Sequence, residues 1–375
     1  MKRASVGRIG ILAVFGTIAS AALSLSSAFS AGWGAPVRVE SIPGTSPDFN
    51  YSGLDGCPFE APDGLTFYMS SDRPGGQGAI DIWKSTRSST GASWGAPVNL
   101  GAPVNTSADD FCPTPVQDGR LFFVSARPGG CGGPDLYVTT PASGGGWSEP
   151  KNLGCQTNSP AAEFSPSLLD MGSNGVVLFF SSARPGGFAA EADGVAPDHD
   201  IYFSPTLPDG SFGAAILVDG VNSAVDDARP NVRTDGLEMV FDSVRPGGQG
   251  GPDIWVSSRA NVQSAWSAPV NPGAPINSPQ GESRASLSRD GERLYFGSTR
   301  PGGDGGSDIY VATRDGSIAG TTTPTGSIAP APPNTGNGAL LGEEGHPVAM
   351  IILVAASAAA LGLIGLRLFA GRPSR

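Results

Sequence analysis

Five acidic residues recur along the chain and are the first candidates for chemistry. Each begins a short segment, and in four of the five a proline follows three residues later, as in DGCP, DFCP and DARP. Carboxylates in such a set could coordinate a hard cation such as Ca²⁺. Two of them could instead act as the acid and the base of glycoside cleavage. The five acids are Asp55, Asp110, Glu163, Asp227 and Glu282.

A second recurring element is the phrase RPGG, which is followed by an aspartate. A phosphate-binding loop would precede a helix, whereas an apolar, strand-like run follows here. Proline and two glycines instead predict a tight hairpin turn. We expect the arginine before the turn and the aspartate after it to form a charge-assisted pair across the hairpin. The predicted pairs are Arg73–Asp81, Arg127–Asp135, Arg184–Asp200, Arg245–Asp253 and Arg300–Asp308.

The third copy of this hairpin breaks the pattern. Its second glycine lies 13 residues before the aspartate, against 5 residues in the other copies. Because functional residues concentrate in loops on rigid scaffolds, this insertion is the asymmetric candidate for a binding site, with a tolerated surface insertion as the alternative. A lone histidine supplies neither metal-ligand spacing nor a Ser-His-Asp triad, so nucleophilic catalysis is not predicted. The candidate residues are Glu191, Asp193, Asp198 and His199.

Four cysteines form a third group. An exported chain permits disulfides. Cys57 and Cys112 occupy matching positions in neighbouring repeats, while Cys131 and Cys155 lie in two loops on the same side of the second repeat. We therefore expect the pairs Cys57–Cys112 and Cys131–Cys155, although four cysteines allow three connectivities and a fully reduced chain remains open.

Short β-strands must position all of these groups. The apolar runs, such as LFFVSA and LEMVFDS, are too short for helices and rich in aromatic and β-branched residues. Each repeat thus contains an acid-headed strand, an apolar strand, a DIYV-type strand and a tryptophan phrase, which is the content of one propeller blade. Five repeats predict an all-β, five-bladed β-propeller over residues 31–317. The first tryptophan phrase, at 33–37, precedes the first blade and is expected to close the last one.

In this arrangement the acids and the RPGG loops share one rim of the channel. The favoured interpretation is a salt-linked ring in which each arginine bridges two carboxylates. The alternative is a cation or ligand site at the channel mouth, with Ca²⁺ as the possible ion. Because every repeat carries the acid, a structural role is favoured over catalysis.

The phrases VNTSADDFCP, QDGRLFFVSARPGG and GGPDLYV resemble the WD-like, TolB-type propeller repeats of bacterial envelope proteins. The resemblance covers nearly the whole repeat region. It implies a scaffold that binds diverse partners rather than one particular function.

Both ends of the chain resemble targeting segments. Residues 1–30 combine basic residues, an apolar stretch and a small-residue site, which predicts a signal peptide. Residues 318–346 are rich in Pro, Thr and Gly and predict a linker. Residues 347–366 predict a transmembrane helix, and the basic tail at 367–375 places that end in the cytoplasm. PPNTG at 332–336 resembles a sortase sorting signal, so cell-wall anchoring is the alternative.

Taken together, the sequence predicts an exported, membrane-anchored and monomeric propeller that binds a protein or carbohydrate partner at the cell surface without catalysis. The net charge of −11 argues against a nucleic-acid partner. The enzyme alternative is a glycoside-active propeller that uses Asp110, Glu163 and Glu282.

Overall fold

A computed structural model describes residues 32–172, 175–188 and 198–314. The predicted signal peptide, linker, transmembrane helix and basic tail lie outside these residues, as do Glu191 and Asp193. Within the described part of the chain no helix is long and apolar enough to cross a membrane.

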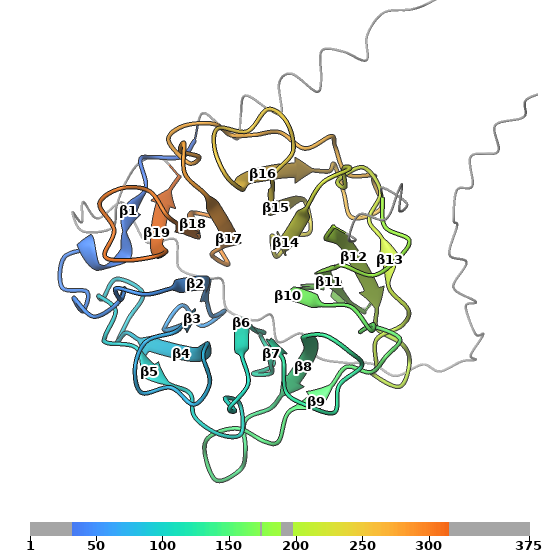
Figure 1. Cartoon of the computed structure of the whole chain (residues 1–375), viewed down its shortest axis with the longest axis horizontal. Coiled ribbons are helices and arrows are strands. Elements are labelled where there is room, and N and C mark those ends of the chain that lie inside the picture. The colour runs from blue at the N-terminus through green and yellow to red at the C-terminus, as the bar shows by residue number, and fades with distance from the viewer. Residues whose placement is uncertain (1–31, 173–174, 189–197, 315–375) are drawn as a thin grey trace, which may run out of the picture. The chain divides into compact units, whose positions relative to one another are not determined.

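The described residues form an all-β propeller with five blades arranged in a ring about a central axis (Figure 1). Blade 1 consists of β2 (Asp55–Glu60), β3 (Thr66–Ser71), β4 (Asp81–Thr86) and β5 (Val98–Asn99). Blade 2 consists of β6 (Asp110–Pro115), β7 (Leu121–Ser125), β8 (Asp135–Thr139) and β9 (Lys151–Asn152). Blade 3 consists of β10 (Glu163–Asp170), β11 (Val176–Ser182), β12 (Asp200–Pro205) and β13 (Ile216–Leu217). Blade 4 consists of β14 (Asp227–Val232), β15 (Glu238–Ser243) and β16 (Asp253–Ser258). Blade 5 consists of β17 (Glu282–Leu287), β18 (Arg293–Ser298), β19 (Asp308–Thr313) and the N-terminal β1 (Val37–Arg38).

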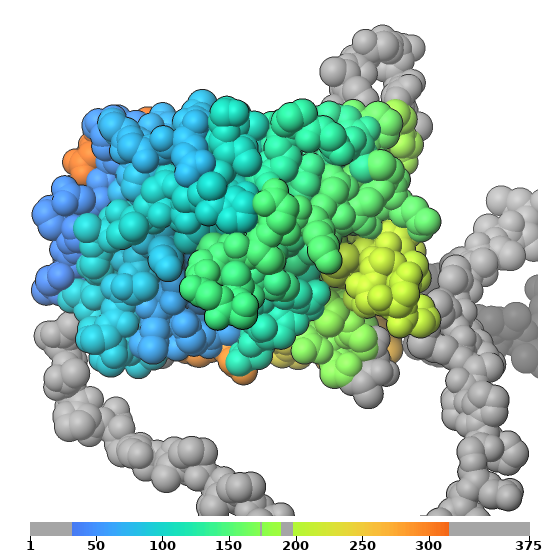
Figure 2. Space-filling view, turned by 90° about the horizontal axis from the view of Figure 1, so that it is seen from below, coloured from blue at the N-terminus to red at the C-terminus, as the bar shows by residue number. Residues whose placement is uncertain are grey.

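The ring closes as the sequence predicts. Strand β1 pairs antiparallel with β19, with Val37 opposite Val311, and the short 3₁₀ turn η1 (Val39–Ser41) follows it. The first strand of the chain therefore completes the last blade. In the edge-on view of Figure 2 the chain follows the outside of the ring from blue through green to yellow, in the order of the blades.

Strand β7 illustrates why these runs fold as buried strands. Leu121, Phe122, Phe123 and Val124 are all 0% exposed. Successive side chains point to opposite faces of a strand. Phe122 and Val124 pack with residues of blade 3, while Leu121 and Phe123 pack with residues of blade 1. Since burying a phenylalanine contributes about 2 kcal/mol, a blade gains its stability from both neighbours.

Glycine in the RPGG loops allows adjacent blades to approach each other closely. A Cβ atom on Gly132 would lie 2.3 Å from the carbonyl oxygen of Pro160, and one on Gly305 would lie 2.0 Å from that of Ser52. These carbonyls belong to the loop that leads into the next blade. Glycine at positions 132 and 305 therefore leaves room for these loops to contact the next blade.

The inner strand of every blade carries a β-bulge at its third residue. The five bulge residues have positive φ angles between 46° and 59°, although none is glycine. The register between the first two strands of each blade shifts at this point. The bulge residues line the narrow part of the channel, and they are Cys57, Cys112, Ser165, Arg229 and Arg284.

Candidate functional site

The five acids at the heads of the inner strands are buried, and each forms an ion pair with the RPGG arginine of its own blade. In blade 2 the Arg127 guanidinium donates to Asp110 Oδ1 at 2.8 Å, and the Asp110 side chain is 0% exposed. The same arginine donates through Nε to Ser125 Oγ at 2.7 Å and through Nη2 to the Val104 carbonyl at 2.5 Å. The equivalent pairs are Arg73–Asp55, Arg184–Glu163, Arg245–Asp227 and Arg300–Glu282.

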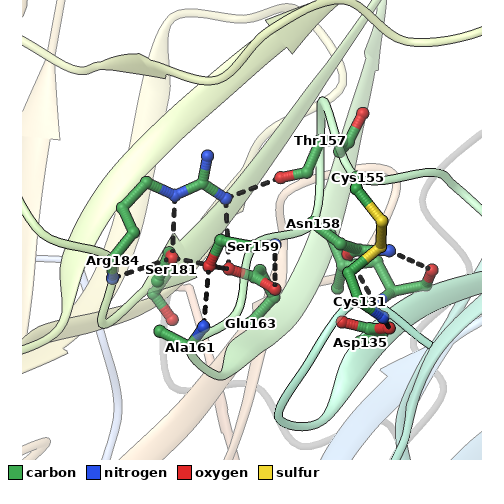
Figure 3. Close-up of polar contacts among 12 residues, drawn as sticks. Cys131, Asp135, Cys155, Thr157, Asn158, Ser159, Ala161, Glu163, Ser181 and Arg184 are labelled. Carbon is green, nitrogen blue, oxygen red and sulfur yellow. Dashed lines mark hydrogen bonds and ion pairs between the residues drawn. A yellow bond between two sulfur atoms is a disulfide. The ribbon is translucent and has the colours of Figure 1, made fainter.

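Figure 3 shows this arrangement in blade 3, where Arg184 contacts Glu163 at 3.1 Å and the Thr157 carbonyl at 2.6 Å. Glu163 also accepts hydrogen bonds from the hydroxyls of Ser159 and Ser182. Burial raises the pKa of Glu163, and the serine hydrogen bonds and Arg184 oppose that rise. The carboxylate is thus saturated by partners from its own blade and its own loop.

The predicted arginine–aspartate pairs across the hairpin are therefore wrong. Each RPGG arginine turns to the acid of the inner strand, and none is ion-paired with the aspartate after the loop. The predicted ring in which an arginine bridges two carboxylates is absent among the described residues for the same reason. The aspartates with which no RPGG arginine pairs are Asp81, Asp135, Asp200, Asp253 and Asp308.

The aspartate after each loop fixes the loop backbone instead. Asp135 Oδ2 accepts the backbone N–H of Cys131 at 2.5 Å and the side-chain amide of Asn152 at 2.8 Å. A Cβ atom on Gly130 would lie 1.9 Å from the same oxygen. The second glycine of RPGG therefore leaves the space that this carboxylate occupies.

These contacts correct the predicted rim site. A carboxylate that is 0% exposed and paired with arginine has no free oxygen to offer a cation or a sugar. The correction covers the predicted binding residues Asp55, Asp110, Glu163, Asp227 and Glu282, and with them the three proposed catalytic acids among them.

Of the four candidate residues in the blade 3 insertion, the structure describes Asp198 and His199. The backbone N–H of His199 donates to Asp226 Oδ1 at 2.8 Å, and its Nδ1 lies 3.0 Å from the same oxygen. The imidazole also packs 5.0 Å from the Phe164 ring, between centroids. Burial raises the pKa of Asp198. His199 therefore links the end of the insertion to the loop that enters blade 4.

Metal binding receives no support from the described residues, among which no group of three or more His, Cys, Asp or Glu side chains could hold an ion. Ca²⁺ binding stays a prediction, but not at the five acids paired with arginine.

Both predicted disulfides are present. Cys57 is bonded to Cys112 and Cys131 to Cys155. The first crosses between the inner strands of blades 1 and 2 at the channel, and the second joins the RPGG loop of blade 2 to the loop that leaves this blade (Figure 3). The two disulfides therefore cross-link blade 2 at its inner strand and at its RPGG loop.

A larger cavity opens at the other end of the channel, where the turns between the first and second strands of the blades meet. It encloses about 580 Å³. Its polar lining includes the carboxylates of Asp118 and Asp170 and the guanidinium groups of Arg120, Arg233 and Arg289. Sequence reasoning missed this cavity because its residues come from turns that resemble ordinary Asp-Gly turns. The available signal was the variation of these turns between repeats that are otherwise alike.

One further carboxylate in the cavity lining is held in place. Glu60 accepts hydrogen bonds from Arg87 at 3.2 Å, from Arg293 at 3.0 Å and from the Tyr295 hydroxyl at 2.6 Å. Burial, followed by the Glu60 charge, raises the pKa of Tyr295. The Glu60 carboxylate is therefore held in one position by its partners, whereas the Asp118 and Asp170 side chains are exposed.

Comparison with known proteins finds similar solved structures and no closer relationship. No family model matches the chain, and no curated protein matches it. TolB from Acinetobacter baumannii is a similar solved structure, with 15% identity and a TM-score of 0.42 over 70% of this chain, which spans 55% of TolB. An α-L-arabinofuranosidase from Lactobacillus brevis has 13% identity and a TM-score of 0.48, covering 74% of this chain and 94% of the enzyme. A xylan β-1,4-xylosidase from Bacillus halodurans has 14% identity and a TM-score of 0.49, covering 77% and 60%.

The sequence analysis favoured a non-catalytic scaffold over an enzyme, and this preference is corrected. Most of the similar structures named are glycoside hydrolases, the class of the enzyme alternative. At these identities and TM-scores they do not assign an activity to this chain.

Proposed function

We propose that this propeller is a carbohydrate-active enzyme that binds a glycan in the 580 Å³ cavity and cleaves a glycosidic bond there. The observation that carries the proposal is the pair of exposed carboxylates from neighbouring blades, Asp118 and Asp170, in one open cavity. Glycoside hydrolysis uses two such groups, about 5 to 9.5 Å apart, on opposite sides of the scissile bond.

The two carboxylates have different surroundings, which suits two different roles. Asp118 forms an ion pair with Arg120 at 2.8 Å and is suited to the role of the carboxylate nucleophile or base. Asp170 accepts the backbone N–H of Gly172 at 2.8 Å and has no cationic partner among residues 32–172, 175–188 and 198–314, which suits the general acid.

The rest of the cavity wall also matches a sugar. Apolar side chains can cover the C–H face of a sugar ring, and amide, hydroxyl and guanidinium groups can bond its hydroxyls. Phe59, Val116 and Leu168 supply the first kind of surface, and Gln117 and Thr234 contribute to the second. These wall residues can bind a sugar but cannot cleave it, so cleavage depends on Asp118 and Asp170.

The test is hydrolysis of aryl glycosides, arabinan and xylan by the full chain and by the variants Asp118→Asn and Asp170→Asn. Each variant is expected to lose activity at least ~100-fold, the usual contribution of a positioned acid or base. Asp209→Asn removes an exposed carboxylate at an outer turn of blade 3 and should retain activity. Wild-type protein that cleaves none of these substrates, or variants as active as Asp209→Asn, would refute the proposal.

We also propose that the chain is exported through residues 1–30 and held in the membrane by residues 347–366. The support is the uncharged run from Val348 to Leu366 followed by a basic tail. Protease treatment of intact cells should degrade the propeller and leave the C-terminal tail protected. A propeller that resists the protease until the cells are lysed would contradict the proposal.

A further inference from the structure

The narrow part of the channel carries an unusual pair of cations. Arg229 and Arg284 occupy the same bulge position on the inner strands of the adjacent blades 4 and 5. Blades 1 and 2 have the disulfide there, and blade 3 has Ser165. All five residues line a space of about 30 Å³. Two arginines therefore line one small space.

Their charges are compensated by a single carboxylate. Arg229 Nη1 donates to Asp242 Oδ2 at 2.6 Å, and Asp242 Oδ1 accepts the backbone N–H of Arg284 at 2.9 Å. The acids nearest along the two strands, Asp227 and Glu282, are paired with the RPGG arginines of their own blades. In the part of the chain that the structure describes, the two arginines of this narrow part, called the channel waist below, thus share one carboxylate, which leaves one positive charge in excess.

That charge belongs to Arg284. Its guanidinium has no hydrogen-bond or ion-pair partner in the part of the chain that the structure describes, and its Nε is buried. Burial and then the charge of Arg229 lower the pKa of Arg284 to about 10, so that it remains protonated at neutral pH. A half-buried cation without a protein partner favours an accompanying anion.

The position of Asp242 supports this reading. Ser70 and Ser181 occupy the same place on the second strands of blades 1 and 3, opposite the second residue of the inner strand. Their hydroxyls accept the backbone N–H of the bulge residue in the next blade, at 2.9 and 3.2 Å. Blade 4 uses a carboxylate for the same contact, so part of the arginine charge is already compensated, and one charge is left over.

We propose that the channel waist binds one small monovalent inorganic anion, of the chloride class, between the guanidinium groups of Arg229 and Arg284. The size of the space suits this class, since about 30 Å³ holds one or two water molecules and a chloride ion is of similar size. Ser165, whose hydroxyl donates to Cys112 Sγ at 3.2 Å, also lines this space. The anion completes the charge balance of the waist and joins blades 3, 4 and 5.

The first test is thermal unfolding of the detergent-solubilised full chain in sodium chloride and in sodium gluconate at equal ionic strength. Chloride is expected to raise the Tm by about 3 °C in a saturable manner, because it binds the folded state only. Arg284→Met should lose this difference. Lys151→Met, which removes an exposed charge on β9, should keep it. A chloride effect of the same size in wild type and Arg284→Met would overturn the proposal.

The second test needs no variant. The chlorine NMR signal of a chloride solution should broaden when the wild-type protein is added, and bromide should reverse the broadening by competition. Gluconate at the same concentration should leave the broadened signal unchanged, because it is too large for the waist. An unbroadened signal, or equal competition by gluconate, would overturn the proposal. Neither test depends on enzymatic activity, so the anion site and the proposed hydrolysis can fail separately.

Discussion

Replacing Asp200 by asparagine is expected to stabilise the protein at neutral pH and to have almost no effect in mild acid. In blade 2 the side-chain amide of Asn152 donates to the aspartate after the RPGG loop, and Asn271 does the same in blade 4 at 3.1 Å. Leu217 takes this place in blade 3 and offers no donor. Burial, with added repulsion from nearby aspartates such as Asp198, raises the pKa of Asp200 to about 6.

The sign and size of the effect follow from this pKa. The carboxyl group has a pKa of about 6 in the folded protein against 3.8 as the ordinary value. Between these values the folded state binds more protons than the unfolded state, so the stability falls as the pH rises from about 4 to about 6. Asp200 is 1% exposed, and the full difference is worth about 3 kcal/mol. Asparagine does not titrate and can still accept the Phe188 N–H, so the variant avoids this loss.

The assay is urea unfolding of the full chain in detergent, followed by tryptophan fluorescence, at about pH 4 and about pH 7.5. The informative quantity is the difference in unfolding free energy between Asp200→Asn and wild type. It should grow from near zero to as much as about 3 kcal/mol between the two pH values. The same difference at both pH values would refute the reasoning. Asp209→Asn, at an exposed position, should give no gain at neutral pH.

Three further predictions concern blade 2. Arg127→Met leaves Asp110 buried without its partner and should destabilise the protein by about 3 kcal/mol in urea unfolding. Gly132→Ala places a methyl group against the backbone of the next blade and should lower the Tm measurably. Replacing Cys131 and Cys155 together by serine opens a loop with a sequence separation of 24, which should cost about 3 kcal/mol of unfolding free energy.

Each of these variants has a matched control. Arg120→Met removes an arginine whose partner, Asp118, is exposed, and should change the stability by less than about 1 kcal/mol. Gly144→Ala adds a methyl group with nothing within 4 Å and should be neutral. Reduction of the wild-type protein should destabilise it at least as much as the double serine variant. Arg127→Met as stable as Arg120→Met, or Gly132→Ala as stable as Gly144→Ala, would contradict the account of blade packing.

The blades could be predicted from the sequence because each repeats the same local pattern. The run around Phe122 and Phe123 indicates a strand with two buried faces, and the tryptophan phrase at 33–37 lacks a blade of its own, which predicts the closure by β1. The Cys57–Cys112 disulfide followed from equivalent positions in neighbouring blades, and Cys131–Cys155 from two loops on the same side of blade 2. These inferences needed only the order and the period of the residues.

The partners of the arginines could not be predicted in this way. Arg127 lies two residues beyond Ser125, whose register partners are Asp110 on one side and Asp135 on the other. A long side chain can reach either acid, and the choice depends on the carbonyl of Val104, which no sequence pattern places nearby.

The arginines at the channel waist can be recognised in the sequence as a departure from the repeat pattern. The third residue of the five acid-headed segments reads Cys, Cys, Ser, Arg, Arg. A strand pattern alone assigns no direction to these residues, because alternation is interrupted by the bulge. The positive φ angles of Arg229 and Arg284, which turn them toward the axis, appear only in three dimensions.

The closure of the ring by β1 also bears on how the chain is made. Val37 is made before every strand of blades 1 to 4, whereas its partner Val311 lies in the last strand of the propeller. Blades 1 to 4 are built from consecutive segments and can form as they emerge, whereas blade 5 must wait for a contact across almost the whole domain. Long-range pairing of this kind slows folding. Until it forms, the outer edge of β19 is an open template for another strand, and the N-terminal segment protects the newly made protein from aggregation at that edge.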